Sequence, residues 1–539
     1  MFGVLRDVTV FFACSKTISR IFNVFFSFAF SSSVAAFDLE LISTIPYNIS
    51  LGVALPWTGA GLDLGQESVR RRYASSGLNL TVTFLYRPED RSCDDANANA
   101  MLLLTEYYNR RAANRCVAII SSACGGHALT PYLAREWNVL LFTNSLVTNA
   151  AINPQSTPTA IGMAGTYDGF ALALFKLFRY FGWFHVTLLQ DSSAATEFYW
   201  ETFKAVPSLA ARSEYSNFTI DGFRFNISEL QTVKDAVSMA AQRSRIFVIL
   251  ANTAVVIRLL RTAKENGIIV PRDYVFIVFQ PLRQAVYGSI TLFDNAADKD
   301  LDLFDSVIFL TTYGGVKSNG SDALEERILE RQRNGYRTIL EPGIKPLDLF
   351  SIRETYNSVE LFAALVNETF AYNHDHSVSA TRMCDGRKLL DSTLNRTFQF
   401  LSGLVDIHAD GSRYADLLLF TFDKQLRTMQ VAARYNSSTE KYVWSLNQTG
   451  ANFTIGQVSD VPACGFAGLD GPCQARNDLM VRLVVPLACL ALVLGPIVIF
   501  VLYRIKQLTG WDDLWWVLSE TGLGASNIIH NAKSEWIRR

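Results

Sequence analysis

Short apolar runs alternate with amphipathic stretches along the first part of the chain. The apolar runs predict buried strands at 50–57, 80–88, 116–124 and 139–144. Helical spacing of apolar residues predicts helices at 61–75, 94–111 and 127–138. Continuous apolar strands between amphipathic helices are typical of a parallel sheet that is covered on both faces.

The same alternation restarts after a gap. Helices are expected at 167–182, 196–206 and 253–267, and strands at 183–192, 244–252 and 273–280. A third region, 347–422, contributes a long helix at 349–373 and then returns to strand-like segments, whereas 298–343 mixes strand and polar loop. Two successive series predict an α/β fold of two lobes, and a cleft between lobes is a usual place for a ligand.

Two further apolar segments concern the membrane. Residues 1–36 combine a basic lead, an apolar run at 21–30 and small residues at 31–36, which is typical of a signal peptide, with an uncleaved anchor as the alternative. Residues 483–503 carry no charge, and Arg504 and Lys506 follow at once. This favours a transmembrane helix with its basic end in the cytoplasm over a buried core helix. We therefore expect a type I plasma-membrane protein with an ectodomain at 37–460, a stalk at 461–482 and a cytoplasmic tail at 504–539.

Glycosylation sequons provide an independent check on this topology. All ten lie in the expected ectodomain and none lies in the tail. They are Asn48, Asn79, Asn217, Asn226, Asn319, Asn367, Asn395, Asn436, Asn447 and Asn452. Their confinement to one side of the apolar segment supports a glycosylated exterior.

Six of the eight cysteines would lie outside the cell, where disulfides form. Cys464 and Cys473 enclose eight residues of a glycine-rich loop, so we predict a disulfide between them just before the membrane. No Cys-X-X-Cys pair and no nearby histidine accompany them, so no zinc site is expected.

Nothing in the chain suggests catalysis or nucleic-acid binding. The formal net charge is −1, and only 18% of the residues are charged. The segment TGAGLDLG at 58–65 is similar to a dinucleotide fingerprint, but its glycine spacing is wrong, and a tight strand-to-helix turn is the favoured interpretation. No phosphate loop, nucleophile elbow or metalloprotease helix is present, so we expect a binding protein with no catalytic residue, metal or cofactor.

The ectodomain resembles the extracellular ligand-binding region of receptor guanylate cyclases, and of natriuretic peptide receptors in particular. The resemblance spans about 50–510 and is carried by 243–279, by 385–422, which includes DGRKLL, NRTF and DIHADGSR, and by PACGFAGLDGPC at 462–473. It implies a bilobed ectodomain of the type I periplasmic-binding-protein class. It also implies a homodimer on the membrane and an extracellular peptide or small-molecule ligand.

The resemblance also implies roles for single residues. It pairs Cys93 with Cys124, and it places Asp95 at an acidic ligand-contact position. In the family a chloride ion sits near the second of these cysteines, after a glycine, and Ala123 replaces that glycine here, which argues against chloride. Cys116 and Cys384 match no family pair, so they pair with each other, stay free or link two chains.

The tail departs from the family. Family cyclases continue into kinase-like and cyclase domains, whereas this sequence stops 36 residues after the apolar segment, too few for a catalytic core. We expect the sensor portion of a receptor guanylate cyclase. The alternatives are a short-tailed clearance or decoy receptor and an adhesion glycoprotein that reuses the fold.

Overall fold

The computed structural model of the chain describes residues 37–49, 51–111, 115–122, 129–194, 196–270, 273–281, 287–314, 318–340, 344–372, 383–445, 458–467 and 472–509. The expected signal peptide, residues 510–539 of the expected cytoplasmic tail, Asn447 and Asn452 therefore lie outside the described residues. The chain divides into two compact units, the first ending at Asp460 and the second beginning at Val461.

The first lobe is built on a five-stranded, all-parallel sheet of order β2-β1-β3-β4-β5. Its strands are β1 (Phe37–Thr44), β2 (Leu78–Leu85), β3 (Cys116–Ser121), β4 (Leu140–Thr143) and β5 (Ala160–Gly162). One face packs on α2 (Leu55–Arg72), α12 (Phe350–Tyr372) and α14 (Gly386–Asp391). The other face packs on α3 (Cys93–Arg110) and α4 (Thr130–Trp137). The sheet is therefore covered on both sides, as its continuous apolar strands predict.

The second lobe contains an eight-stranded sheet of order β15-β14-β13-β10-β9-β8-β6-β7. Five strands are parallel: β6 (His185–Asp191), β7 (Thr219–Phe225), β8 (Ile246–Leu250), β9 (Val275–Gln280) and β10 (Val307–Thr312). Three antiparallel strands extend it: β13 (Leu417–Asp423), β14 (Thr428–Asn436) and β15 (Lys441–Trp444).

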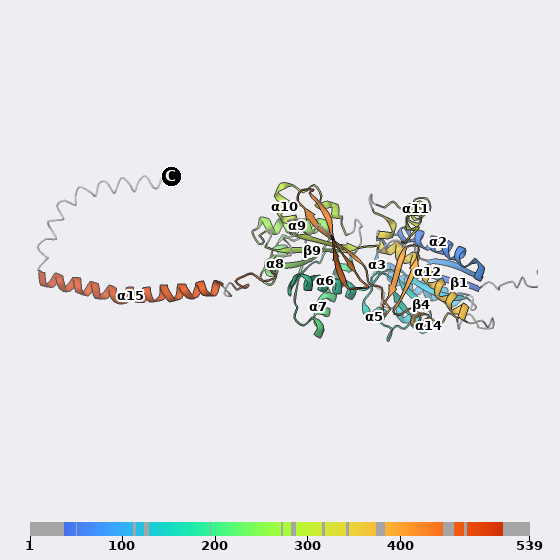
Figure 1. Ribbon diagram of the computed structural model, residues 1–539, viewed down its shortest axis with the longest axis horizontal. Coiled ribbons are helices and arrows are strands. Elements are labelled where there is room, and N and C mark those ends of the chain that lie inside the picture. The colour runs from blue at the N-terminus through green and yellow to red at the C-terminus, as the bar shows by residue number, and fades with distance from the viewer. Residues whose placement is uncertain are drawn as a thin grey trace, which may run out of the picture. The chain divides into compact units, whose positions relative to one another are not determined.

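Helices cover both faces of the second sheet. In β8, Ile246 and Val248 face α6 (Tyr167–Phe181) and α7 (Glu197–Ala210). The intervening Phe247 and Ile249 face α8 (Leu230–Ala241), α9 (Thr253–Glu265) and α10 (Leu301–Phe304). Side chains alternate between the faces of a strand, so each apolar run supplies both cores. Figure 1 shows α8, α9 and α10 around this sheet and α2 and α12 around the other.

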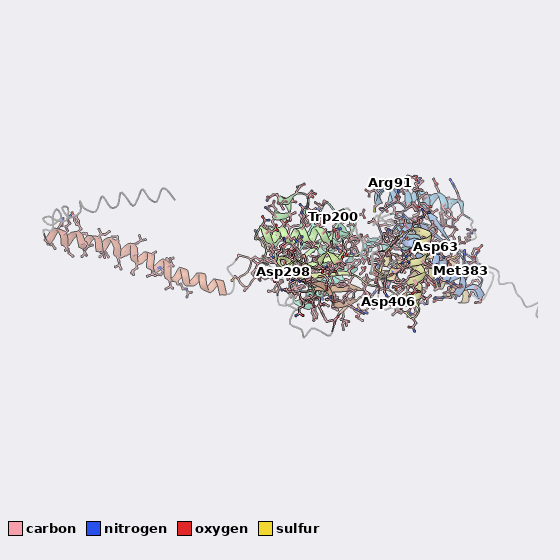
Figure 2. The ribbon with its side chains drawn as sticks, turned by 90° about the horizontal axis from the view of Figure 1, so that it is seen from above. Asp63, Arg91, Trp200, Asp298, Met383 and Asp406 are labelled. Atoms are coloured by element: carbon pink, nitrogen blue, oxygen red, sulfur yellow. A yellow bond between two sulfur atoms is a disulfide. The ribbon has the colours of Figure 1, made fainter. Side chains whose placement is uncertain are left out.

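The chain passes between the lobes three times. It crosses from β5 to α6, from β10 through α11 (Ser321–Arg331) to α12, and from the hairpin β11 (Arg396–Phe400) and β12 (Gly403–Ile407) to β13. Each lobe is thus assembled from separate stretches of sequence. Asp63, Met383 and Asp406 accordingly share the first lobe, while Trp200 and Asp298 belong to the second (Figure 2).

The prediction of two α/β lobes is confirmed, but one strand within it is wrong. Within the predicted strand at 50–57, residues 51–54 form a turn and 55–57 begin α2, and the first strand among the described residues is β1, at 37–44. Pro56 lies in the first turn of α2, where proline is tolerated. The glycines of TGAGLDLG therefore lie inside this helix and not in a strand-to-helix turn. They bring α2 close to α12: a Cβ on Gly61 would lie 2.8 Å from the carbonyl oxygen of Ile352.

The second unit is dominated by α15 (Pro472–Thr509). Within it, residues Arg482–Leu508 are long and apolar enough to cross a membrane, and this is the one such helix among the described residues. Pro486 and Pro496 lie inside the helix. Prolines are better tolerated in membrane helices than in soluble ones.

Candidate functional site: the strand ends and the hinge between the lobes

Polar residues gather where the parallel strands of both sheets end. Thr143 and Asn144 lie at the end of β4, and Asp191 and Gln280 at the ends of β6 and β9; all four are buried. In parallel α/β sheets, ligands bind outside the carboxyl ends of the strands. These ends therefore form the candidate ligand site.

The starts of two helices from different lobes, α3 after β2 and α7 after β6, carry carboxylates that influence one another. Burial raises the pKa of Glu197, at the start of α7, and the carboxylates of Glu201 and of Asp94 raise it further. Asp94 belongs to α3 of the first lobe, so the electrostatic effect on Glu197 acts from one lobe to the other.

Buried hydroxyl groups in the first lobe have spare hydrogen-bonding capacity. Thr44 Oγ1 and Ser122 Oγ, at the ends of β1 and β3, are buried and make no hydrogen bond within the described part of the chain. Buried polar groups are normally paired, so unpaired ones at strand ends mark positions where a ligand or water would contribute a partner.

The three interlobe connections meet at one place, which we call the hinge. The amide of Arg413 donates to the carbonyl of Gly162 at 2.8 Å, which joins the third connection to the first. The amide of Tyr313 donates to the carbonyl of Asp416 at 2.8 Å, which joins the second connection to the third. Arg353 Nη1 then donates to the carbonyl of Tyr313 at 3.2 Å and ties α12 to the same point.

The family motif DIHADGSR forms the turn at this hinge. Asp410 Oδ1 accepts from the amide of Ser412 at 3.0 Å, and Gly411 has φ +77°, a conformation that glycine adopts without strain. The amide of Gly162 donates to the carbonyl of Gly411 at 2.9 Å, so the turn is bonded to β5. The turn thereby directs Arg413 toward α12.

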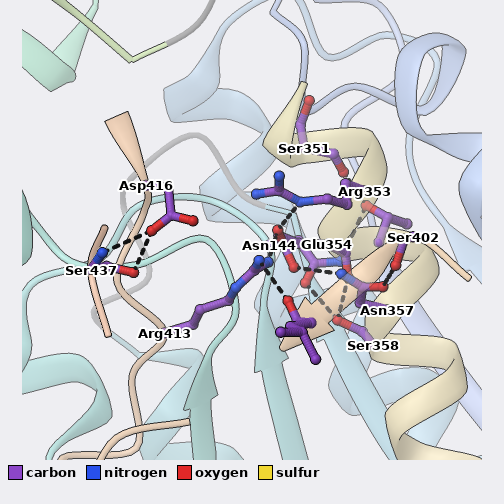
Figure 3. Close-up of polar contacts among 12 residues, drawn as sticks. Asn144, Ser351, Arg353, Glu354, Asn357, Ser358, Ser402, Arg413, Asp416 and Ser437 are labelled. Atoms are coloured by element: carbon purple, nitrogen blue, oxygen red, sulfur yellow. Dashed lines mark hydrogen bonds and ion pairs between the residues drawn. The ribbon is translucent and has the colours of Figure 1, made fainter. Parts of the chain in front are cut away.

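Glu354 lies at the centre of a buried ionic network (Figure 3). It is fully buried and accepts hydrogen bonds from Arg413, from Arg353 Nε at 2.6 Å and from Asn357 Nδ2 at 2.9 Å. Burial alone would raise the pKa of Glu354, but Arg353 and Arg413 outweigh it and hold the pKa below its usual range. Glu354 therefore remains ionised, and it holds Arg413 of the third connection against α12.

A second set of hydrogen bonds extends this network to the strand ends. Ser358 Oγ donates to Asn144 Oδ1 at 2.9 Å, and Asn144 Nδ2 donates to Thr355 Oγ1 at 3.2 Å. Ser402 Oγ donates to Asn357 Oδ1. Residues at the candidate ligand site are thus connected to the hinge through one turn of α12.

Asp95 lies at the start of α3 and closes a capping box. Asp95 Oδ2 accepts from the amide of Ser92 at 3.1 Å, while the amide of Asp95 donates to Ser92 Oγ at 3.1 Å. Hydrogen bonds from Ser92 and Arg91 lower the pKa of Asp95. This exposed carboxylate therefore has a local structural role, and its role in ligand contact stays a prediction.

The cysteines are resolved in part. Cys116 of β3 forms a disulfide with Cys384, which precedes α14, so the two cysteines that matched no family pair bond to each other. Cys93 and Cys464 are both disulfide-bonded, whereas Cys124 and the side chain of Cys473 lie outside the described residues. The pairings Cys93–Cys124 and Cys464–Cys473 stay predictions, and Ala123, which bears on chloride, also lies outside the described residues.

The described sequon asparagines are accessible to different extents. Five are exposed: Asn48, Asn79, Asn217, Asn319 and Asn395. Three are half-buried: Asn226, Asn367 and Asn436. None of these eight is fully buried, which is compatible with the predicted glycans.

The comparison with protein families identifies the fold of lobes and hinge. Residues 66–425 match the receptor family ligand binding region, which is most of the chain. The chain belongs to this family. It is also 22% identical over 494 residues to guanylate cyclase 2G of Mus musculus, a match that covers 87% of this chain and 42% of that protein. The ligand-binding family thus accounts for the two lobes, and the chain spans less than half the length of this receptor-cyclase relative.

The sequence alone did not identify Glu354, the residue at the centre of the hydrogen-bond network. Arg353 and Glu354 are adjacent charges in a helix whose other residues are largely apolar, and such a pair in a buried helix is the signal that was available. Arg413 was identified within its motif, but the distance of 59 residues between it and Glu354 concealed their contact.

Proposed function

We propose that this protein is a single-pass cell-surface receptor whose ectodomain binds an extracellular ligand between its two lobes, as the sensing part of a receptor of the guanylate cyclase type. The match of residues 66–425 to the receptor family ligand binding region carries this proposal. The apolar helix Arg482–Leu508 and the sequons before it support a type I orientation in the plasma membrane.

The hinge suggests how binding would be communicated. A ligand that contacts the strand ends of both lobes would favour one interlobe angle over others, because its contacts differ between the two arrangements. The buried network around Glu354 holds the three connections as a pivot. A shift of the second lobe would then reach the stalk, since Asp460 is anchored to that lobe: its Oδ2 accepts from the amides of Phe184 and His185, both at 2.7 Å.

Catalysis is not assigned to the described residues. The family match covers a ligand-binding region, and the similarity to guanylate cyclase 2G covers 42% of that protein. We propose that the two lobes bind the ligand and that the apolar helix anchors the protein in the membrane. We also propose that a homodimer on the membrane is the signalling form.

A test uses the full chain in animal cells, with one epitope tag after residue 36 and another at the C-terminus. The proposal expects antibody access to the first tag on intact cells and to the second only after permeabilisation. A radioiodinated natriuretic peptide serves as the ligand probe, and saturable binding that unlabelled peptide displaces would support a peptide receptor. Failure of the first tag to reach the surface would contradict the receptor proposal. Surface display without displaceable binding would contradict the peptide ligand alone.

A further inference from the structure

A polar pocket of about 500 Å³ lies beside the hinge. Its walls come from both lobes: Asp406 of β12 and His408, which follows that strand, belong to the first lobe, and the end of β14 and the turn after it contribute residues 436–439 of the second lobe. Arg413 of the hinge also lines it. The pocket is large enough for a ligand, since small-molecule sites usually measure about 300–1,000 Å³.

The turn after β14 is bonded to the first lobe and to the hinge connection. Ser438 Oγ donates to Asp406 Oδ2. The amide and the Oγ of Ser437 both donate to Asp416 Oδ1 at 2.8 Å (Figure 3). The pocket is therefore bounded by a direct contact between the lobes, and its lining offers residues of both to an occupant.

The two arginines at the pocket are already ion-paired, and its two carboxylates already accept hydrogen bonds. Arg413 bonds to Glu354, and Arg396 forms an ion pair with Glu368 at 3.1 Å. Asp406 and Asp416 accept from the serines of the turn. An anionic ligand would find no unpaired arginine among these residues, while Asp406 and Asp416 can still accept from hydroxyl groups, so the lining accommodates a hydroxyl-rich molecule.

The lining also suits a sugar. The rings of His408 and Tyr414 stack at 4.4 Å with an interplanar angle of 23° and both line the pocket. Aromatic rings offer an apolar face to the C–H face of a pyranose, while carboxylate, hydroxyl and amide groups exchange hydrogen bonds with its hydroxyls.

Asn436, a sequon residue, lies in the wall of this pocket. It is half-buried, and its Oδ1 accepts from the amide of Thr439 at 2.8 Å and from Thr439 Oγ1 at 3.0 Å. These bonds fix the plane of the side-chain amide. Its Nδ2, the atom to which an N-glycan is attached, makes no hydrogen bond within the described part of the chain. Asn395, the other sequon residue at the pocket, is exposed.

We propose that the N-glycan carried by Asn436 is seated in this pocket, with its first sugars in contact with both lobes. The inference rests on the extracellular placement of the ectodomain given above. A covalently attached sugar at this position would contact both lobes beside the hinge. It would thereby restrict the angles that the two lobes can adopt relative to one another. The glycan of Asn395 would instead extend into solvent.

Site-resolved enzymatic release tests the proposal on the full chain purified from animal cells in detergent. Peptide N-glycosidase in ¹⁸O-water marks each released site as ¹⁸O-aspartate, and mass spectrometry follows every site with time, in native and in denatured protein. We expect release at Asn436 to be at least about tenfold slower in the native state than at the exposed control Asn217, because folded structure protects it. After denaturation the two rates should be equal.

Each outcome of this experiment is decisive. Native release at Asn436 as fast as at Asn217, or an unoccupied Asn436 on a chain whose other sequons carry glycans, would overturn the seated glycan and leave the receptor proposal intact. A chain without glycans at any sequon would overturn the extracellular placement itself.

A second measurement follows the effect on the hinge. Asn436→Gln removes the glycan, and Asn217→Gln is the matched control that removes an exposed one. Hydrogen–deuterium exchange in residues 404–416 should be several-fold faster in Asn436→Gln than in the control. Equal exchange in the two variants would contradict a glycan that contacts both lobes.

Discussion

Arg413, in the last connection between the lobes, donates a hydrogen bond to Glu354, a fully buried residue near the start of α12. The pair joins the third connection, between β12 and β13, to α12 of the first lobe, at the hinge where all three connections meet. Removing one partner of a buried ion pair leaves an uncompensated charge, which destabilises the folded protein.

Glu354→Gln should lower the free energy of unfolding by about 3–5 kcal/mol, because Arg353 and Arg413 would remain buried without their carboxylate. Denaturant unfolding of the full chain measures this. Glu368→Gln is the control on the same helix: its ion pair with Arg396 is half-exposed, so a change below about 1 kcal/mol is expected. Equal effects of the two substitutions on the free energy of unfolding would contradict the larger contribution expected for the buried ion pairs of Glu354.

The same carboxylate makes stability depend on pH. The pKa of Glu354 is lower in the folded protein than its usual value, so its contribution is complete at neutral pH, above the unfolded pKa of about 4.3. This contribution is lost as the pH falls below that value and through the folded pKa. The difference in melting temperature between wild type and Glu354→Gln should therefore shrink on acidification. A difference that stays constant from neutral to acid pH would contradict this linkage.

Gly61→Ala should destabilise the first lobe by about 1–3 kcal/mol, since the added methyl group would press on the backbone of α12. Thermal unfolding of the full chain gives the effect. Gly495→Ala, in α15, is the control because no atom lies within 4 Å of a Cβ built there. A neutral Gly61→Ala would mean that the two helices separate at little cost.

Cys384→Ser should release Cys116 and lower stability by about 2–5 kcal/mol, because the disulfide joins β3 to a segment 268 residues later. Thiol labelling of the unfolded, unreduced chain should detect one additional free cysteine, and the melting temperature should fall. Cys489→Ser is the control, since Cys489 is free. Unchanged labelling would contradict the assigned pair.

Asp460→Ala should loosen the end of the ectodomain. It removes the acceptor for the partly buried amides of Phe184 and His185, at a cost of about 1 kcal/mol for each donor left unpaired. Hydrogen exchange at the start of β6 should accelerate. Asp423→Ala, which removes a carboxylate that accepts from two turn amides on the surface, should affect only residues near 425 and 426. No change at β6 would show that Asp460 does not anchor the chain there.

The sequence predicts the general architecture because its strands are continuous apolar runs and its helices have clear spacing. It fails at β1, where Glu40 and Thr44 are buried polar residues that interrupt the apolar pattern. The run at 50–57 then looked more strand-like than the true strand. Glu40 is accommodated by Tyr107 and Arg115, contacts that no local pattern reveals.

The site was less predictable than the fold. The turn around Gly411 and the candidate Asp95 could be found because their motifs are local. The partners of Arg413, Cys116 and Asn144 are 59, 268 and 211 residues away, respectively, so only the folded topology brings each pair together. Asp95 shows the converse, because its carboxylate serves a capping box that the spacing from Ser92 to Asp95 could have indicated.

The interleaving of the lobes has a consequence for biosynthesis. The first sheet appears early in translation, but α12, α14 and the β11–β12 hairpin that complete its core follow only after most of the second lobe has been made. Since domains generally fold as their chain emerges, the incomplete first lobe would wait in the secretory pathway with an apolar face uncovered. Cys116 lies between Cys93 and Cys124 in the sequence, so it would be synthesised with that predicted pair long before Cys384. On the proposed extracellular topology, chaperones and disulfide isomerases of that compartment would therefore act on the nascent chain, and mispairing of Cys116 would be the expected folding error.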